Sequence, residues 1–188
     1  MAAIIHNPLS PSARHWTYQD LLGFDESERY EILDGQLISM SPSPSVYHQR
    51  LLAKLYLMIA AFLQQHPLGE AFFAPLDVVF AEDNTAQPDL IFIANENAGI
   101  IKNQVFGAPD LAAEILSPSS IRRDRYEKLE QFARFGVKEY WIVDPANRSV
   151  EILSLRDSRY VLHASAAESG LVASLVLTGL EFDVSQLF

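Results

Sequence analysis

Two stretches decide the fold, Gln87-Pro88-Asp89-Leu90-Ile91-Phe92-Ile93 and Leu111-Ala112-Ala113-Glu114-Ile115-Leu116-Ser117. Each is an apolar run of strand length that carries one carboxylate, Asp89 at the start of the first run and Glu114 inside the second. The interior of a strand is an unfavourable place for an uncompensated acid. A divalent metal ion shared by Asp89 and Glu114 would compensate both charges. An ion pair with Arg or Lys, or a position on a solvated edge, would also explain Glu114.

The composition is that of one ordinary globular domain. The chain has 188 residues, of which 49% are hydrophobic and 20% charged, and it contains no cysteine. This length allows one domain with a sizeable core and gives no reason for a second. We therefore expect a single domain over residues 1–188, in which residues 1–20 form an extended N-terminal arm leading into a short helix capped by Thr17. Without cysteine, a disulfide framework and thiolate chemistry are excluded, which is consistent with a reducing compartment.

Charge and hydropathy limit the partners. The formal net charge of -10 argues against a general coat for nucleic acid, because counterion release needs clustered Lys and Arg. Any site for a polyanion must therefore be local. The start of the chain lacks the basic region of a secretory signal, and the longest uncharged apolar run, residues 55–63, is too short to span a bilayer. These features predict a cytoplasmic protein without a membrane segment.

Hydrophobic periodicity and turn residues predict an α/β fold with a mixed central β-sheet flanked by α-helices and with additional β-hairpins. The Asp34-Gly35 pair is typical of a type I′ hairpin turn, in which both residues adopt positive φ angles. The expected elements, in chain order, are a hairpin over 30–40, an amphipathic helix from Ser45 to about Gln65, a β region over 70–81, a polar turn over 82–86, the Asp89 strand, a loop or short helix over 95–107, the Glu114 strand, a helix over about 121–135 ended by Gly136, strands over 138–143 and 150–155, and two or three short strands within 160–184.

The helix expected after Glu114 gathers basic charge beside that acid. Six basic and three acidic residues lie within residues 122–138, in a chain whose net charge is negative. Such a helix is usually a solvated face, on which Asp124 and Lys128 form an i,i+4 pair. Here a short Ser-Pro turn joins the strand to the helix, so Lys128 could reach the same cavity as Asp89 and Glu114. Metal-assisted phosphodiester hydrolysis uses such a set, because carboxylates hold Mg²⁺ and an ammonium group orients water or offsets developing charge.

Together these residues resemble the Uma-two family of restriction-endonuclease-like proteins, a branch of the PD-(D/E)XK nuclease superfamily. The resemblance covers the chain from about Tyr30 to the end. It implies a core of a mixed four-stranded sheet flanked by helices, a Mg²⁺ cofactor that Mn²⁺ could replace, and DNA as substrate. A homodimer would suit duplex cleavage, since two strands need two sites. The matching segments are Tyr30-Glu31-Ile32-Leu33-Asp34-Gly35, His48, Pro88-Asp89, Glu114-Ile115-Leu116-Ser117-Pro118-Ser119, Asp124, Lys128 and Gly136-Val137-Lys138-Glu139-Tyr140-Trp141-Ile142-Val143-Asp144-Pro145.

Two positions depart from the pattern of the superfamily. Leu116 stands where the superfamily places a lysine two residues after the acid, so the lysine role would fall to Lys128, as it does in this branch. Phe132 stands where the family usually has a tyrosine. The resemblance thus implies a Mg²⁺-dependent endonuclease acting on DNA, with Asp89, Glu114 and Lys128 as catalytic residues and both acids as metal ligands. The alternative is a catalytically inactive binding or assembly module on the same fold.

Further candidates for the site each have a structural alternative. Glu31 resembles the extra acid that these nucleases carry before their first sheet strand, but it could also be a solvated acid beside a turn. Asp77 could support the site as an additional acid or form an ion pair at a strand edge. His48 could contact phosphate or water, or it could be a capping or surface residue. Asp124 matches the family pattern and could instead serve only as the ion-pair partner of Lys128.

Overall fold

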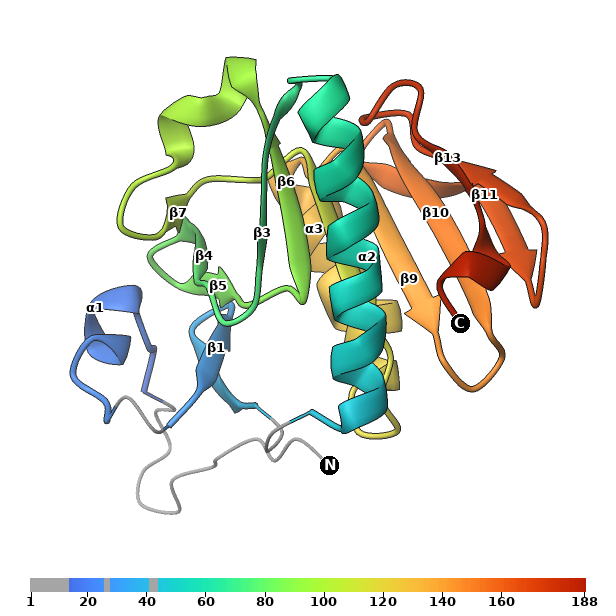
Figure 1. The fold of residues 1–188 in the computed structure, drawn as a ribbon. Coiled ribbons are helices and arrows are strands. Elements are labelled where there is room, and N and C mark those ends of the chain that lie inside the picture. Colours follow the sequence, from blue (N-terminus) through green and yellow to red (C-terminus); the bar gives the residue numbers. More distant parts are fainter. Residues whose placement is uncertain (1–13, 26–27, 41–43) are drawn as a thin grey trace.

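The computed structural model describes residues 14–25, 28–40 and 44–188, and its largest element is a mixed sheet of six strands in the order β11-β10-β9-β8-β6-β3 (Figure 1). β8 and β9 run parallel, and the other neighbouring pairs run antiparallel. The central strands β10, β9, β8 and β6 match the expected mixed core, and β3 and β11 extend it on either side. The strands are β3 (Gly69–Phe73), β6 (Leu90–Ala94), β8 (Leu111–Ile115), β9 (Glu139–Asp144), β10 (Ser149–Arg156) and β11 (Arg159–Ala167).

A second sheet of five strands, in the order β2-β1-β5-β4-β7, stands beside the first (Figure 1). Its hairpin β1–β2 confirms the expected Asp-Gly turn, because Asp34 and Gly35 have φ angles of 49° and 74°. The remaining pair, β12 (Leu171–Ala173) and β13 (Glu181–Asp183), forms a two-stranded sheet. The strands of the second sheet are β1 (Tyr30–Leu33), β2 (Gln36–Ser39), β4 (Val78–Ala81), β5 (Asn84–Ala86) and β7 (Val105–Phe106).

Two long helical segments cover opposite faces of the six-stranded sheet. The first is α2 (Val46–Gln65), which begins after Ser45, whose side chain accepts a hydrogen bond from the His48 backbone N–H at 3.2 Å. The second spans residues 121–135 and comprises a π-helical turn, η2 (Arg123–Glu127), followed by α3 (Lys128–Phe135). The short helices are α1 (Tyr18–Leu21) and the 3₁₀ turns η1 (Asn95–Ile100) and η3 (Val184–Gln186). No helix in the described part of the chain is long and apolar enough to cross a membrane.

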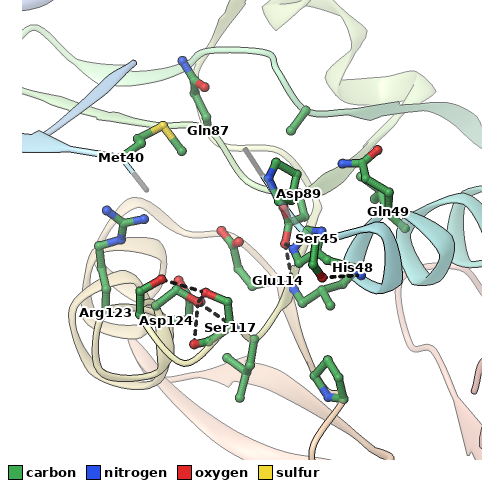
Figure 2. Close-up of a pocket in the computed structure, with 18 of the residues that line it drawn as sticks. Met40, Ser45, His48, Gln49, Gln87, Asp89, Glu114, Ser117, Arg123 and Asp124 are labelled. Carbon is green, nitrogen blue, oxygen red and sulfur yellow. Dashed lines mark hydrogen bonds and ion pairs between the residues drawn. The ribbon is translucent and has the colours of Figure 1, made fainter. Parts of the chain in front are cut away.

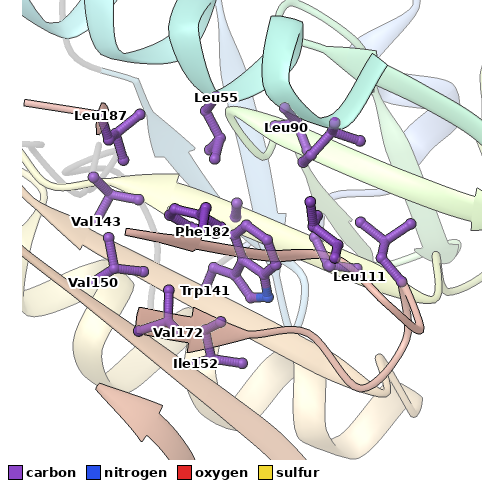
Figure 3. Close-up of a cluster of buried hydrophobic side chains, with 14 of the residues drawn as sticks. Leu55, Leu90, Leu111, Trp141, Val143, Val150, Ile152, Val172, Phe182 and Leu187 are labelled. Atoms are coloured by element: carbon purple, nitrogen blue, oxygen red, sulfur yellow. The ribbon is translucent and has the colours of Figure 1, made fainter. Parts of the chain in front are cut away.

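Alternation along the strands divides the core into two layers. Leu90 of β6 points to the α2 side, where it packs with Leu55 and Trp141 (Figure 3). Its neighbour Ile91 points to the α3 side, where it packs with Phe132. Both faces of the sheet are therefore covered, which explains the continuous apolar runs around Asp89 and Glu114 in the sequence.

The structure refines the sequence-based expectations for several connecting segments. Residues 70–81 form two strands, β3 and β4, which belong to different sheets. Residues 84–86, expected within a turn, form strand β5, because distant groups satisfy their polar side chains. Thr85 Oγ1 accepts from the Ile32 N–H at 3.0 Å, and Asn84 Oδ1 accepts from Arg134 at 2.8 Å. The segment 95–107 contains η1 and also β7, and β11 is longer than expected.

The N-terminal expectation is tested only in part. The helix α1 begins after Thr17, as expected, and the carboxylate of Asp20 accepts a hydrogen bond from the Thr17 N–H at 2.9 Å. The first 13 residues of the expected arm lie outside the described residues.

Gly136 ends the helix in the left-handed conformation, with φ of 87°. In the described structure, a Cβ at this position would meet nothing within 4 Å, so Gly136→Ala would be strained only through its backbone. We expect the substitution to lower the free energy of unfolding by about 1 kcal/mol in urea denaturation. Gly99→Ala is the matched control, since Gly99 has equal space without a positive φ. An equal loss in both variants would contradict this explanation.

Candidate active site

A cavity of about 610 Å³ opens where the first turn of α2, the carboxyl end of β8 and the π-helical turn meet (Figure 2). The strand register brings the two predicted acids to it. β6 and β8 are antiparallel with Leu90 opposite Ala113, so the residue before Leu90 and the residue after Ala113 lie at the same end of the pair. Those residues are Asp89 and Glu114, and both line the cavity.

Asp89 is held in place by backbone and side-chain hydrogen bonds. Its Oδ2 accepts from the Ile115 N–H at 2.8 Å and from His48 Nε2 at 3.1 Å. Neither bond uses Oδ1. Burial by itself would lower the pKa of His48, but the hydrogen bond and the charge of Asp89 raise it above the usual value. The structure thus places His48 at the site through its contact with Asp89.

Lys128 reaches Glu114 from the helix. Its Nζ lies 2.5 Å from Glu114 Oε1, and both side chains are about 5% exposed or less. Burial raises the pKa of Glu114 well above its usual value, and the nearby acids Asp124, Asp89 and Glu31 add to that shift while Lys128 opposes it. Burial alone would lower the pKa of Lys128, but Glu114 and the other acids raise it, so the lysine stays an ammonium.

Glu31 is a buried partner of this lysine rather than a solvated turn residue. One of its oxygens lies 3.1 Å from Lys128 Nζ and accepts from the Gln87 N–H at 2.8 Å, and the other lies 3.3 Å from Arg123. Burial by itself would raise the pKa of Glu31, but Lys128 and Arg123 hold it below the usual value. Asp77 lies behind this layer, where it accepts from Gln87 Nε2 at 2.8 Å, and it does not line the cavity.

Asp124 lines the cavity from the helix side. Its Oδ1 lies 3.9 Å from Lys128 Nζ and, within the described part of the chain, is buried without a hydrogen-bond partner. Burial raises the pKa of this carboxyl, and Lys128 opposes the shift. An acceptor oxygen left unsatisfied in a cavity is available to a cation or a donor from a ligand.

The two residues that depart from the superfamily pattern, Phe132 and Leu116, both belong to the hydrophobic core. Phe132 is fully buried, and its ring packs between those of Tyr140 and Phe80. Leu116 packs in the same apolar cluster. Lys128 approaches Glu114 from the neighbouring helix and brings an ammonium group to it.

The sequence reasoning missed two residues that belong to this cluster, Arg123 and Gln87. Both line the cavity, and both contact Glu31. Gln87 stands next to the Pro88-Asp89 pair, which was the available signal for it. Arg123 carries no comparable signal, because an ideal α-helix of 3.6 residues per turn places residues five apart about 140° from each other. It would point away from Lys128.

The charges of the cluster fit a divalent cation. Its four carboxylates face two basic side chains, so two negative charges stay uncompensated when all six groups are ionised, and His48 offsets at most one. Within the described residues, no three His, Asp or Glu side chains form a ready-made metal cage. Asp89 and Glu114 would supply the one or two carboxylates that Mg²⁺ usually binds, with water and phosphate as its other ligands. The acids are Glu31, Asp89, Glu114 and Asp124, and the bases are Arg123 and Lys128.

Comparison with known proteins agrees with this fold. The family model Uma2, described as "Putative restriction endonuclease", matches residues 16–185. A solved structure from Anabaena variabilis, described as "a putative nuclease belonging to DUF820", superposes with a TM-score of 0.73 at 20% sequence identity, covering 92% of this chain and 97% of that one. At this identity the likeness shows the fold. Curated protein sequences give no match. Because the family model matches most of this chain, the chain belongs to the Uma2 family.

Proposed function

We propose that this protein is a Mg²⁺-dependent endonuclease that hydrolyses phosphodiester bonds in DNA. The observation that carries the proposal is the convergence of Asp89, Glu114 and Lys128 on one cavity, with the ammonium 2.5 Å from the Glu114 carboxylate. A cavity lined by two acids and a lysine offers metal ligands on one side and a fixed positive charge on the other. Family membership supports nuclease activity in particular.

Each side chain has a distinct task in this reaction. Asp89 and Glu114 would hold the ion, and the Ile115 N–H fixes the orientation of Asp89 through its 2.8 Å bond to Oδ2. When bound, the metal lowers the pKa of a coordinated water and polarises the phosphate. The Lys128 ammonium orients the attacking water and offsets the negative charge that develops on the phosphate oxygens. Glu31 and Asp124 keep that ammonium charged and in place.

The surroundings of the cavity favour a nucleic-acid substrate only locally. Three basic residues, Arg29, Arg123 and Lys128, line the cavity beside three acids, in a chain whose net charge is -10. Binding would therefore concentrate on the phosphates nearest the site rather than spread along the duplex. Cutting both strands of a duplex needs two such sites, which a homodimer of this chain would supply. The same proposal places this activity in the cytoplasm.

Calorimetric titration with Mg²⁺ and Mn²⁺ tests the proposal directly, with plasmid cleavage followed on the same samples. We expect wild type to bind the metal and to cut, and we expect the Asp89→Asn, Glu114→Gln double variant to do neither, because it lacks both ligand charges. Cleavage that survives in a clean preparation of the double variant would contradict the proposal. Wild-type protein that binds neither ion and cuts no DNA would instead favour the inactive binding module, which needs no metal site.

A further inference from the structure

The helix that carries Lys128 is wound differently where it borders the cavity. Between Arg123 and Glu127 it forms a π-helical turn, in which the Lys128 N–H donates to the Arg123 carbonyl oxygen, an i→i+5 bond. Residues five apart then lie on the same side of the helix, whereas an α-helix would separate them by about 140°. As a result, Arg123 and Lys128 both reach the carboxylate of Glu31, at 3.3 Å and 3.1 Å.

Pairing with Glu31 does not use the full donor capacity of Arg123. A guanidinium carries five N–H donors, which lie in one plane. Within the described residues, Nε and Nη1 of Arg123 are buried and have no hydrogen-bond acceptor, and the contact with Glu31 is an ion pair without hydrogen-bond geometry. Glu31 also lies 3.1 Å from Lys128 Nζ and accepts from the Gln87 N–H. The guanidinium therefore keeps donor capacity for an acceptor other than Glu31, and Arg123 borders the cavity.

The cavity offers room for that acceptor. Arg123 lies across the opening from Asp89 and His48, with Glu114 between them (Figure 2). A phosphate group bound in the opening between the two acids and Arg123 would lie within reach of the guanidinium. A planar guanidinium matches two phosphate oxygens better than a lysine does.

We propose that Arg123 is a substrate-binding residue whose guanidinium binds a non-bridging oxygen of the DNA phosphate in the cavity, and that the π-helical turn sets its position. This inference rests on the proposed function, since it takes the phosphodiester as the ligand. It adds a phosphate contact to the three residues assigned above, and it gives the π-helical turn a role in placing that contact.

Titration with inorganic phosphate in the presence of Mg²⁺ tests the contact without depending on cleavage. The variants are Arg123→Gln, Arg123→Lys and, as a control for the lost charge, Arg122→Gln. Arg122 is the adjacent residue, and its side chain is 89% exposed. Phosphate affinity is measured by calorimetry, and thermal unfolding of each variant monitors the fold. The dependence of DNA binding on salt and the KM and kcat of plasmid cleavage are measured on the same proteins.

We expect Arg123→Gln to weaken phosphate binding about tenfold or more, Arg122→Gln to change it less than twofold, and Arg123→Lys to restore only part of the loss. For DNA, the KM of Arg123→Gln rises, and its salt slope falls by about one unit. Equal phosphate affinity in Arg123→Gln and wild type, or no phosphate binding by wild type, would overturn the inference. If wild type binds phosphate through Arg123 but cuts no DNA, the inference stands and the nuclease proposal fails.

Discussion

Asp89→Asn is expected to lower metal-dependent DNA cleavage by about a thousandfold or more while the protein stays folded. The amide has the shape of the carboxylate, and its oxygen can still accept the hydrogen bond from the Ile115 N–H that now measures 2.8 Å. What it removes is the negative charge that a hard divalent cation requires of its ligand. The effect should therefore appear in metal affinity and turnover and should be small in the free energy of unfolding.

A second readout of Asp89→Asn is independent of activity. The pKa of His48 is raised by the Asp89 carboxylate against the effect of burial. With an amide in its place, that pKa should fall, which NMR titration of the imidazole resonances measures. A His48 pKa equal to that of wild type would show that the two side chains are not coupled in solution.

Asp110→Asn is the matched control for this substitution. Asp110 is 1% exposed and precedes the opposite end of β8, where it pairs with Lys138 at 2.6 Å and accepts from the Ala94 N–H at 2.8 Å. Because Lys138 is largely solvated, we expect a loss of about 1–2 kcal/mol in stability and unchanged cleavage per folded molecule. If both variants were equally inactive, the loss in Asp89→Asn could not be assigned to a metal ligand.

The elements that the sequence predicts well are those with strong local signals. The Asp34-Gly35 hairpin, the long helix after Ser45 and the stop at Gly136 all follow from residues adjacent in the chain. Strand β5 has no such signal, because its Asn84 and Thr85 look like turn residues. They become strand residues through partners 47 to 53 positions away, such as Gln131 and Ile32.

The residues of the candidate site also differ in how far the sequence predicts them. Two acid-bearing strands are readable as a pattern, but their antiparallel register is what brings Asp89 beside Glu114. The burial of Glu31 could not be predicted, since the sequence is equally compatible with a solvated acid. Packing of β1 against the helix makes this residue 3% exposed. Arg123 depends on the π-helical turn, and helical periodicity predicts the opposite face for it. Local sequence patterns thus indicate candidate residues, and tertiary contacts determine which of these residues lie together in the site.

Lys128→Met is expected to affect stability and catalysis together. The lysine is 4% exposed and contacts Glu114, Glu31 and Asp124 at 2.5, 3.1 and 3.9 Å. Methionine keeps the unbranched stem but removes the positive charge. Of the two basic side chains in the cluster, Arg123 then remains to face three buried acids. Removing one partner of a buried ion pair costs about 3–5 kcal/mol, which urea denaturation would measure. Lys54→Met is the control, since Lys54 is an exposed lysine that donates to the Leu187 carbonyl oxygen, and we expect a loss below about 1 kcal/mol.

Adding Glu114→Gln to Lys128→Met separates the two roles of the lysine. The double variant has no carboxylate at position 114, so the charge that the lysine most closely compensates is gone and much of the lost stability should return. Cleavage should not return, because neither the ammonium nor the ligand charge is present. A single variant, Lys128→Met, that cut DNA at the wild-type rate would contradict the catalytic role, and the lysine would then serve only to balance buried acids. If stability recovers in the double variant while single-turnover cleavage stays at least about a hundredfold below wild type in the single variant, Lys128 acts on the reaction as well as on the fold.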